Sequence, residues 1–176
     1  MAIIVDTNCF ARVFSRTNKE HPEFAPVLDW ILYGKGFLVY GGSKYIRELN
    51  KCKKYLRFIR LLKDAKKVYI CDCNKVDELQ AKYERMINNP DFDDPHLPAI
   101  VQVSKCRLIC SMDLRSVPFV TSRELYPKRF HLPHYYSSSR DAWLLTDEYI
   151  DPRLKNYSRL LNKEVRDTIY RSADKL

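Results

Sequence analysis

The 176-residue sequence lacks the features that mark membrane, secreted and repetitive proteins. No stretch approaches the roughly 18 to 20 consecutive apolar residues that a membrane span needs, so we expect no membrane partner. The first residues, Met-Ala-Ile-Ile-Val-Asp, contain neither the basic region nor the long apolar region of a secretory signal. Internal repeats and low-complexity tracts are also missing. We therefore expect a cytoplasmic protein of ordinary single-domain size with one hydrophobic core.

The six cysteines match neither a disulfide framework nor a common zinc site. A disulfide-stapled domain is typically small, loop-rich and secreted. Structural zinc is usually held by cysteines two residues apart, whereas Cys71 and Cys73 are separated by one residue and Cys106 and Cys110 by three. We expect mostly buried, reduced thiols, with a structural zinc ion as the minor alternative.

Short apolar segments alternate with longer amphipathic ones over the first 110 residues. This alternation predicts right-handed crossovers, and hence an α/β fold with a mostly parallel sheet and helices on both sides. Strands are expected at residues 2–5, 36–40, 68–71 and 107–110. Helices are expected at residues 8–14, 22–32, 44–63 and 75–87. A further helix is expected to end at residue 104, with Asp94 as its N-terminal cap. Residues 126–139 have no clear period and are expected to form an extended surface segment. A tail helix is expected at 156–171.

Positive charge is concentrated in one segment. Ten basic and two acidic residues lie between Lys44 and Lys67, which accounts for most of the net charge of +9. A concentrated basic stripe is typical of proteins that bind polyanions, whereas a solvated helix face usually mixes both signs. On a helical wheel, apolar and basic residues separate onto opposite sides. We expect nucleic acid to be bound by Lys51, Lys53, Lys54, Arg57 and Arg60.

Four acidic residues are placed where a parallel sheet would gather them. Asp6 and Asp113 follow the first and fourth expected strands, Glu48 lies in the first turns of a helix, and Asp94 directly precedes another. Functional groups collect at the carboxyl ends of parallel strands and at adjoining helix starts. Each acid alone is more often a helix cap or an ion-pair partner. Four together would repel one another unless a hard divalent cation bound between them.

In order along the chain, these acids and their neighbours resemble those of PIN domain nucleases. The resemblance is carried by Val5–Asn8, Tyr45–Leu49, Asp93–Leu97 and Ser111–Asp113. It implies a three-layer α/β/α sandwich on a sheet of four to five strands. Residues 1–125 would be the PIN-like nuclease domain, and residues 126–176 an extension packed on or appended to it.

The resemblance also implies roles for individual residues. Asp6, Glu48, Asp94 and Asp113 would bind Mg²⁺ or Mn²⁺ and carry catalysis. Three further residues, Asn8, Ser111 and Asp93, would orient those carboxylates or bound water, although Asp93 is also an alternative to Asp94 as ligand. Family members often carry another acid shortly after the last aspartate, where this chain has Arg115 and Ser116.

The activity implied is metal-dependent hydrolysis of RNA phosphodiester bonds by an endoribonuclease, either a toxin or an RNA-processing enzyme. RNA is the expected partner, and an inhibitory antitoxin protein and a homodimer are further candidates. The alternatives are a catalytically idle RNA-binding or scaffold protein of the same fold, and a structure-specific DNA nuclease. For His96, local packing at the helix start and contact with a scissile phosphate both remain open.

Overall fold

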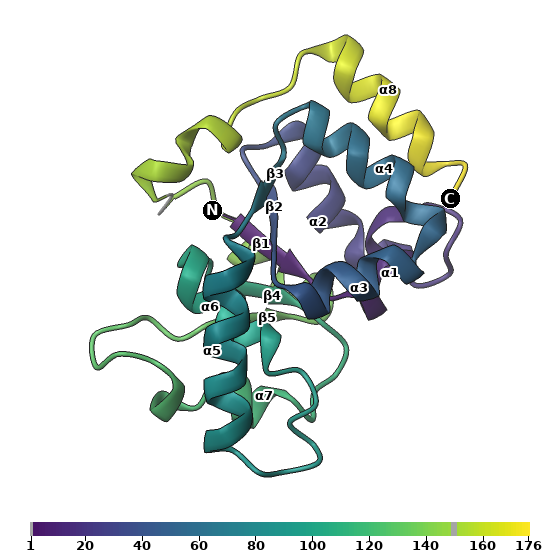
Figure 1. Cartoon of the computed structure of the whole chain (residues 1–176). Helices are drawn as coiled ribbons and strands as arrows, with labels where there is room; N and C mark the ends of the chain where they lie inside the picture. Colours follow the sequence, from purple (N-terminus) through teal and green to yellow (C-terminus); the bar gives the residue numbers. More distant parts are fainter. Residues whose placement is uncertain (1, 149–150) are drawn as a thin grey trace.

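Within residues 2–148 and 151–176, which the computed structural model describes, five strands form a parallel sheet in the order β3-β2-β1-β4-β5 (Figure 1). The strands are β1 (Ala2–Val5), β2 (Phe37–Tyr40), β3 (Val68–Ile70), β4 (Leu108–Cys110) and β5 (His134–Tyr136). The first four lie within a residue or so of the expected positions.

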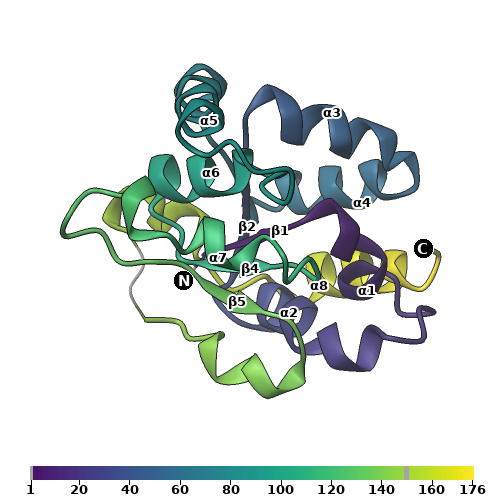
Figure 2. The ribbon, with the colours of Figure 1, turned by 90° about the horizontal axis from the view of Figure 1, so that it is seen from below.

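Helices cover both faces of the sheet, which confirms the expected three-layer α/β/α fold. Figure 2 shows α5 and α6 above the strands and α2 below them. The α-helices are α1 (Phe10–Phe14), α2 (His21–Tyr33), α3 (Ser43–Lys51), α4 (Lys53–Asp64), α5 (Cys73–Met86), α6 (His96–Ser104), α7 (Val117–Val120) and α8 (Lys163–Ala173). Short 3-10 helices are η1 (Thr7–Cys9), η2 (Arg123–Leu125), η3 (Ser139–Leu144) and η4 (Pro152–Tyr157). Among these helices, none combines the length and apolar character that crossing a membrane requires.

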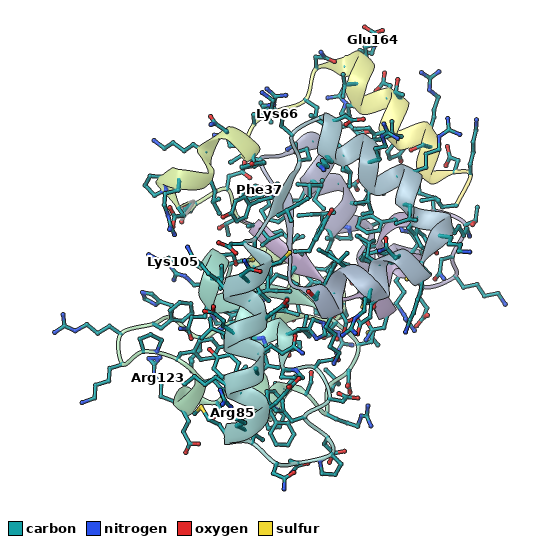
Figure 3. The ribbon with its side chains drawn as sticks, in the orientation of Figure 1. Phe37, Lys66, Arg85, Lys105, Arg123 and Glu164 are labelled. Carbon is teal, nitrogen blue, oxygen red and sulfur yellow. The ribbon has the colours of Figure 1, made fainter. Side chains whose placement is uncertain are left out.

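The central strands are buried on both faces. All residues of β1, β2 and β4 are buried, as expected for parallel strands covered by helices on two sides. Phe37 therefore lies inside the molecule, whereas Lys66 and Lys105 reach the surface (Figure 3). The six cysteines, all within the described ranges, are free; four are buried and two half-buried, so the expectation of buried thiols holds for four.

Elements within residues 126–148 and 151–176 belong to the same sheet and its helical layers. Within the segment 126–139, β5 is extended as expected but pairs with β4, and the expected surface position is wrong for the fully buried Tyr136. Farther along the chain, η3 packs on α2 and β5, and α8 packs on α4 and α2. The tail helix begins later than expected, at Lys163, because the side chain of Asn162 caps it by accepting from the Val165 N–H.

The expected single helix over 44–63 is interrupted. Cys52, with φ −80° and ψ 49°, ends α3 and precedes α4. Neither proline nor glycine marks this position in the sequence, so the break was not predicted. The break lets α4 pack against β3 and α8 instead of continuing along the axis of α3. At the other end of α3, Gly42 has φ +81°, and a Cβ there would lie 2.5 Å from Val76 Cγ1. Only glycine suits this turn, which directs the chain into α3.

Candidate metal centre

The four acids expected from the sequence lie at the carboxyl edge of the sheet. Asp6 directly follows β1 and Asp113 lies just beyond β4, while Glu48 is in α3 and Asp94 precedes α6. Because β1 and β4 are parallel neighbours, their carboxyl ends meet at one edge. The chain after β1 enters η1, which packs against α3.

Asp6 is the most buried of the four, with 4% of its surface exposed. Its carboxylate accepts hydrogen bonds from Ser111 Oγ at 2.7 Å and from Asn8 Nδ2 at 2.8 Å. Burial, helped by the nearby charges of Asp94 and Glu48, raises the pKa of Asp6 to about 6, against the lowering effect of its hydrogen bonds. Ser111 and Asn8 thus fix the orientation of a carboxylate whose negative charge is costly.

Asp94 lies between the other acids. Its expected role as a helix cap is wrong, because Pro95 occupies the cap position and makes no side-chain cap hydrogen bond to α6. The Asp94 carboxylate instead accepts from Lys44 Nζ at 3.3 Å, and the same ammonium group donates to the main-chain carbonyl of Asp93. Burial raises the pKa of Asp94, and Lys44 opposes that shift. Lys44, expected only as part of the basic stripe, therefore belongs to the site.

Glu48 is held toward this edge by the anchoring of α3. The buried Tyr45 hydroxyl donates to the main-chain carbonyl of Val5, at the end of β1, and the Tyr45 ring stacks on Tyr40 with centroids 5.4 Å apart. One turn further on, Glu48 Oε2 accepts from Thr7 Oγ1 at 3.4 Å. Burial and the charge of Asp94 raise the pKa of Glu48.

Asp113 is in a different electrostatic setting. Arg115 Nε and Nη2 donate to its two carboxylate oxygens at 3.0 and 3.2 Å, and these bonds lower the pKa of Asp113. The same guanidinium lies 3.9 Å from Asp93 Oδ2. Asp93 itself is exposed, whereas Asp94 is half-buried. Arg115 thus neutralises the outer side of the cluster.

His96 is the residue whose surroundings the sequence did not reveal. Its side chain is 1% exposed, and neither ring nitrogen has a hydrogen-bond partner among the described residues. Nε2 lies 3.8 Å from Glu48 Oε2, and Nδ1 lies 3.7 Å from Asp94 Oδ1. Burial lowers the pKa of His96 to about 3, helped by the charge of Lys44. The only advance signal was its position two residues after Asp94.

Among the described residues, two groups of potential metal ligands share Asp94. Glu48, Asp94 and His96 form one, and Asp93, Asp94 and Asp113 form the other, with ligand atoms within 4.8 Å of one another in each. Carboxylate oxygens suit hard divalent cations such as Mg²⁺ and Mn²⁺. The unpartnered nitrogens of His96 and the raised pKa values of Glu48 and Asp94 fit a cation bound by the first group. Asp6, whose pKa is also raised, belongs to neither group.

The basic residues expected to bind nucleic acid are exposed, and three of them line two separate grooves. Lys51 lies close enough to Glu48 to lower the pKa of that carboxyl group, although burial raises it overall. Lys54 and Arg57 line a groove between α4 and α8, together with Arg171 and Lys175. Arg60 lines a separate hollow between α3 and α4, and Lys53 is exposed on α4.

One member of the sequence stripe is not at the surface. Lys67 is 0% exposed, and its Nζ donates to the main-chain carbonyls of Gly34 and Gly36 at 2.9 and 3.0 Å. Burial lowers its pKa to about 8. Lys67 therefore stabilises the turn between α2 and β2 and is removed from any nucleic-acid surface.

Comparisons of the chain with protein-family models, with curated proteins and with solved structures gave no match.

Substituting Asp6 should reveal the electrostatic cost of this cluster. The pKa of Asp6 rises from 3.8 to about 6 on folding, so the native state binds its proton more tightly than the unfolded chain. Unfolding therefore releases a proton between pH 4 and 6, and the free energy of unfolding falls as pH rises through that window. Asp6→Asn removes the ionisable group and with it this pH dependence. In the presence of chelator, the free energy of unfolding of the variant relative to that of wild type should therefore increase by on the order of 2 kcal/mol from pH 4 to pH 6.

Urea unfolding at several pH values measures this difference. Asp64→Asn, at an exposed position at the end of α4, serves as the control and should show no such pH-dependent gain. A constant difference between Asp6→Asn and wild type across pH 4–6 would contradict the electrostatic description of the site.

Proposed function

We propose that this protein is a PIN-like, divalent-metal-dependent endoribonuclease that hydrolyses RNA phosphodiester bonds. The observation that supports this function most strongly is the convergence of Asp6, Glu48, Asp94 and Asp113 from four separate elements onto one edge of the sheet. The order of these acids along the chain resembles that of PIN domain nucleases. The basic side chains of α3 and α4 are consistent with a polyanionic substrate.

The proposed ligands of the ion are Asp6, Glu48, Asp94 and Asp113. Bound there, Mg²⁺ or Mn²⁺ would lower the pKa of an attacking water and neutralise charge developing on the phosphate. Ser111 and Asn8 hold the Asp6 carboxylate in one orientation through their hydrogen bonds. Preorganised ligands of this kind cost no rearrangement when the reaction proceeds.

Two basic side chains near the cluster support the proposed interaction with a polyanionic substrate. Lys44 Nζ contacts Asp94, and 24% of the Lys44 side chain is exposed, so its ammonium group could also contact a phosphate oxygen entering the site. Lys51, near Glu48, extends the positive charge toward α4. The RNA backbone would pass from the acidic cluster onto the groove that contains Lys54 and Arg57.

Cleavage of labelled single-stranded RNA and DNA in Mg²⁺ or Mn²⁺ tests the proposed activity. We expect RNA cleavage that chelator abolishes, and a decrease of roughly 100-fold or more in Asp6→Asn, because removing even a residue that only orients a metal ligand typically costs 10- to 100-fold. The matched control is Asp64→Asn, which removes an exposed carboxylate at the opposite edge of the sheet and should cleave like wild type.

The substrate panel separates the alternatives. Cleavage of DNA alone would retain the metal site and overturn RNA as the substrate. Salt-sensitive RNA binding without cleavage of any polymer would favour a catalytically idle RNA-binding protein and contradict the proposed enzyme.

The double variant Lys54→Gln, Arg57→Gln tests the path of the RNA. In chelator, which prevents cleavage, we expect weaker binding of single-stranded RNA by fluorescence anisotropy. Removing one phosphate-binding cation should reduce the slope of log K against log salt by about 0.7, so removing both should reduce it by about 1.4. Lys82→Gln, Arg85→Gln is the matched control, because these exposed residues have the same spacing on α5.

An unchanged slope in the Lys54, Arg57 variant would show that the groove between α4 and α8 lies outside the RNA path. An equal decrease in both double variants would indicate that binding depends on total charge and not on this groove.

A further inference from the structure

His96 is buried between two carboxylates without a hydrogen bond to either. Its side chain is 1% exposed, and within residues 2–148 and 151–176 both ring nitrogens lack partners. The closest carboxylate oxygens are those of Glu48 and Asp94, at 3.8 and 3.7 Å, beyond hydrogen-bond distance. A buried polar group without a partner costs roughly 1–3 kcal/mol, so a protein seldom retains one without a compensating interaction.

The hydrogen-bonding capacities of His96 and its two carboxylate neighbours indicate what kind of group would satisfy them. A neutral imidazole carries one N–H donor and one nitrogen with a lone pair, whereas an ionised carboxylate only accepts. Glu48 faces one nitrogen and Asp94 faces the other. Whichever nitrogen carries the proton, the second turns its lone pair toward a negatively charged oxygen. A cation between the two atoms converts that repulsion into coordination.

The separations between the His96 nitrogens and the carboxylate oxygens, and the packing of the His96 ring, suit a metal ion bound by both kinds of ligand. Ligand atoms that each lie about 2.1 Å from one metal ion are roughly 3 to 4 Å apart, and both nitrogen–oxygen separations fall within that range. Tyr45 packs edge-on against His96 with centroids 6.1 Å apart, and this contact restricts the ring's orientation. Lys44, whose charge acts on His96, donates to Asp94 and Asp93 instead.

We propose that His96 is a nitrogen ligand of the metal ion, together with Glu48 and Asp94, so that the centre has a mixed nitrogen and oxygen ligand set. This inference rests on the proposed metal-dependent function of the same site. One ring nitrogen binds the ion, and the other carries the proton and faces the adjacent carboxylate, as is common among metal-bound histidines.

A histidine ligand changes which ion the centre selects. Mg²⁺ strongly prefers oxygen ligands and retains several waters, whereas imidazole suits transition metals. The centre should therefore bind Mn²⁺ in preference to Mg²⁺, and His96 should be the source of that preference. A site made only of Asp6, Glu48, Asp94 and Asp113 would have no nitrogen ligand to discriminate between the two ions.

Electron spin echo envelope modulation of the Mn²⁺-loaded protein tests the ligand directly, because a coordinated imidazole produces a ¹⁴N modulation. We expect this signal in wild type and its disappearance in His96→Gln. His134→Gln is the matched control, since His134 is exposed at the start of β5, at the opposite edge of the sheet. The wild-type spectrum is informative even if His96→Gln folds poorly.

The Mn²⁺ and Mg²⁺ affinities of wild type and variants provide a second test of His96 as a ligand. Titration of Mn²⁺, followed by the electron paramagnetic resonance signal of the free ion, should show binding weakened about 10-fold or more in His96→Gln. Mg²⁺ affinity, measured by competition, should change much less, so the preference for Mn²⁺ should fall. His134→Gln should retain the wild-type preference.

The remaining outcomes separate this inference from the proposed function. Mn²⁺ binding by wild type without a ¹⁴N modulation would overturn His96 as a ligand and leave an all-carboxylate centre. A modulation that persists in folded His96→Gln would also overturn it. Failure of wild type to bind Mn²⁺ at all would contradict the proposed metal-dependent nuclease itself.

Discussion

Asp6, Glu48 and Asp94 meet at the carboxyl edge of the sheet, where burial raises the pKa of each and a neighbouring carboxylate adds to the shift. Holding like charges together in a partly buried site costs free energy, which the surrounding residues only partly offset. Ser111 and Asn8 donate to Asp6, and Lys44 and Arg115 supply positive charge. Such a site is suited to a cation.

The fold brings these groups together because of its topology. Parallel strands β1 and β4 lie side by side, so the residues that follow them emerge at the same edge. The hydroxyl of Tyr45 fastens α3 to the end of β1 and thereby positions Glu48. The break at Cys52 then allows α4 to pack on α8, so that Lys54 and Arg57 line a groove with basic residues from the end of the chain.

Sequence patterns predicted the sheet and the location of the acids well, because both depend on local periodicity and on the position of polar residues after apolar runs. They could not predict contacts between distant segments. The pairing of Lys44 with Asp94, the burial of Lys67 and the edge strand β5 all depend on tertiary packing. For His96 the sequence left both local packing and contact with a phosphate open, since only the fold places it between Glu48 and Asp94.

The proposed function depends on the binding of a divalent cation by the clustered carboxylates. Isothermal titration of Mn²⁺ into chelator-treated protein at pH 6, in two buffers with different ionisation enthalpies, tests it most directly. The pKa of Asp6 is about 6, so part of the population must lose a proton before its carboxylate can bind the ion. We predict Mn²⁺ binding coupled to proton release, with less release in Asp6→Asn. Absence of binding, or binding without proton release, would contradict the claim.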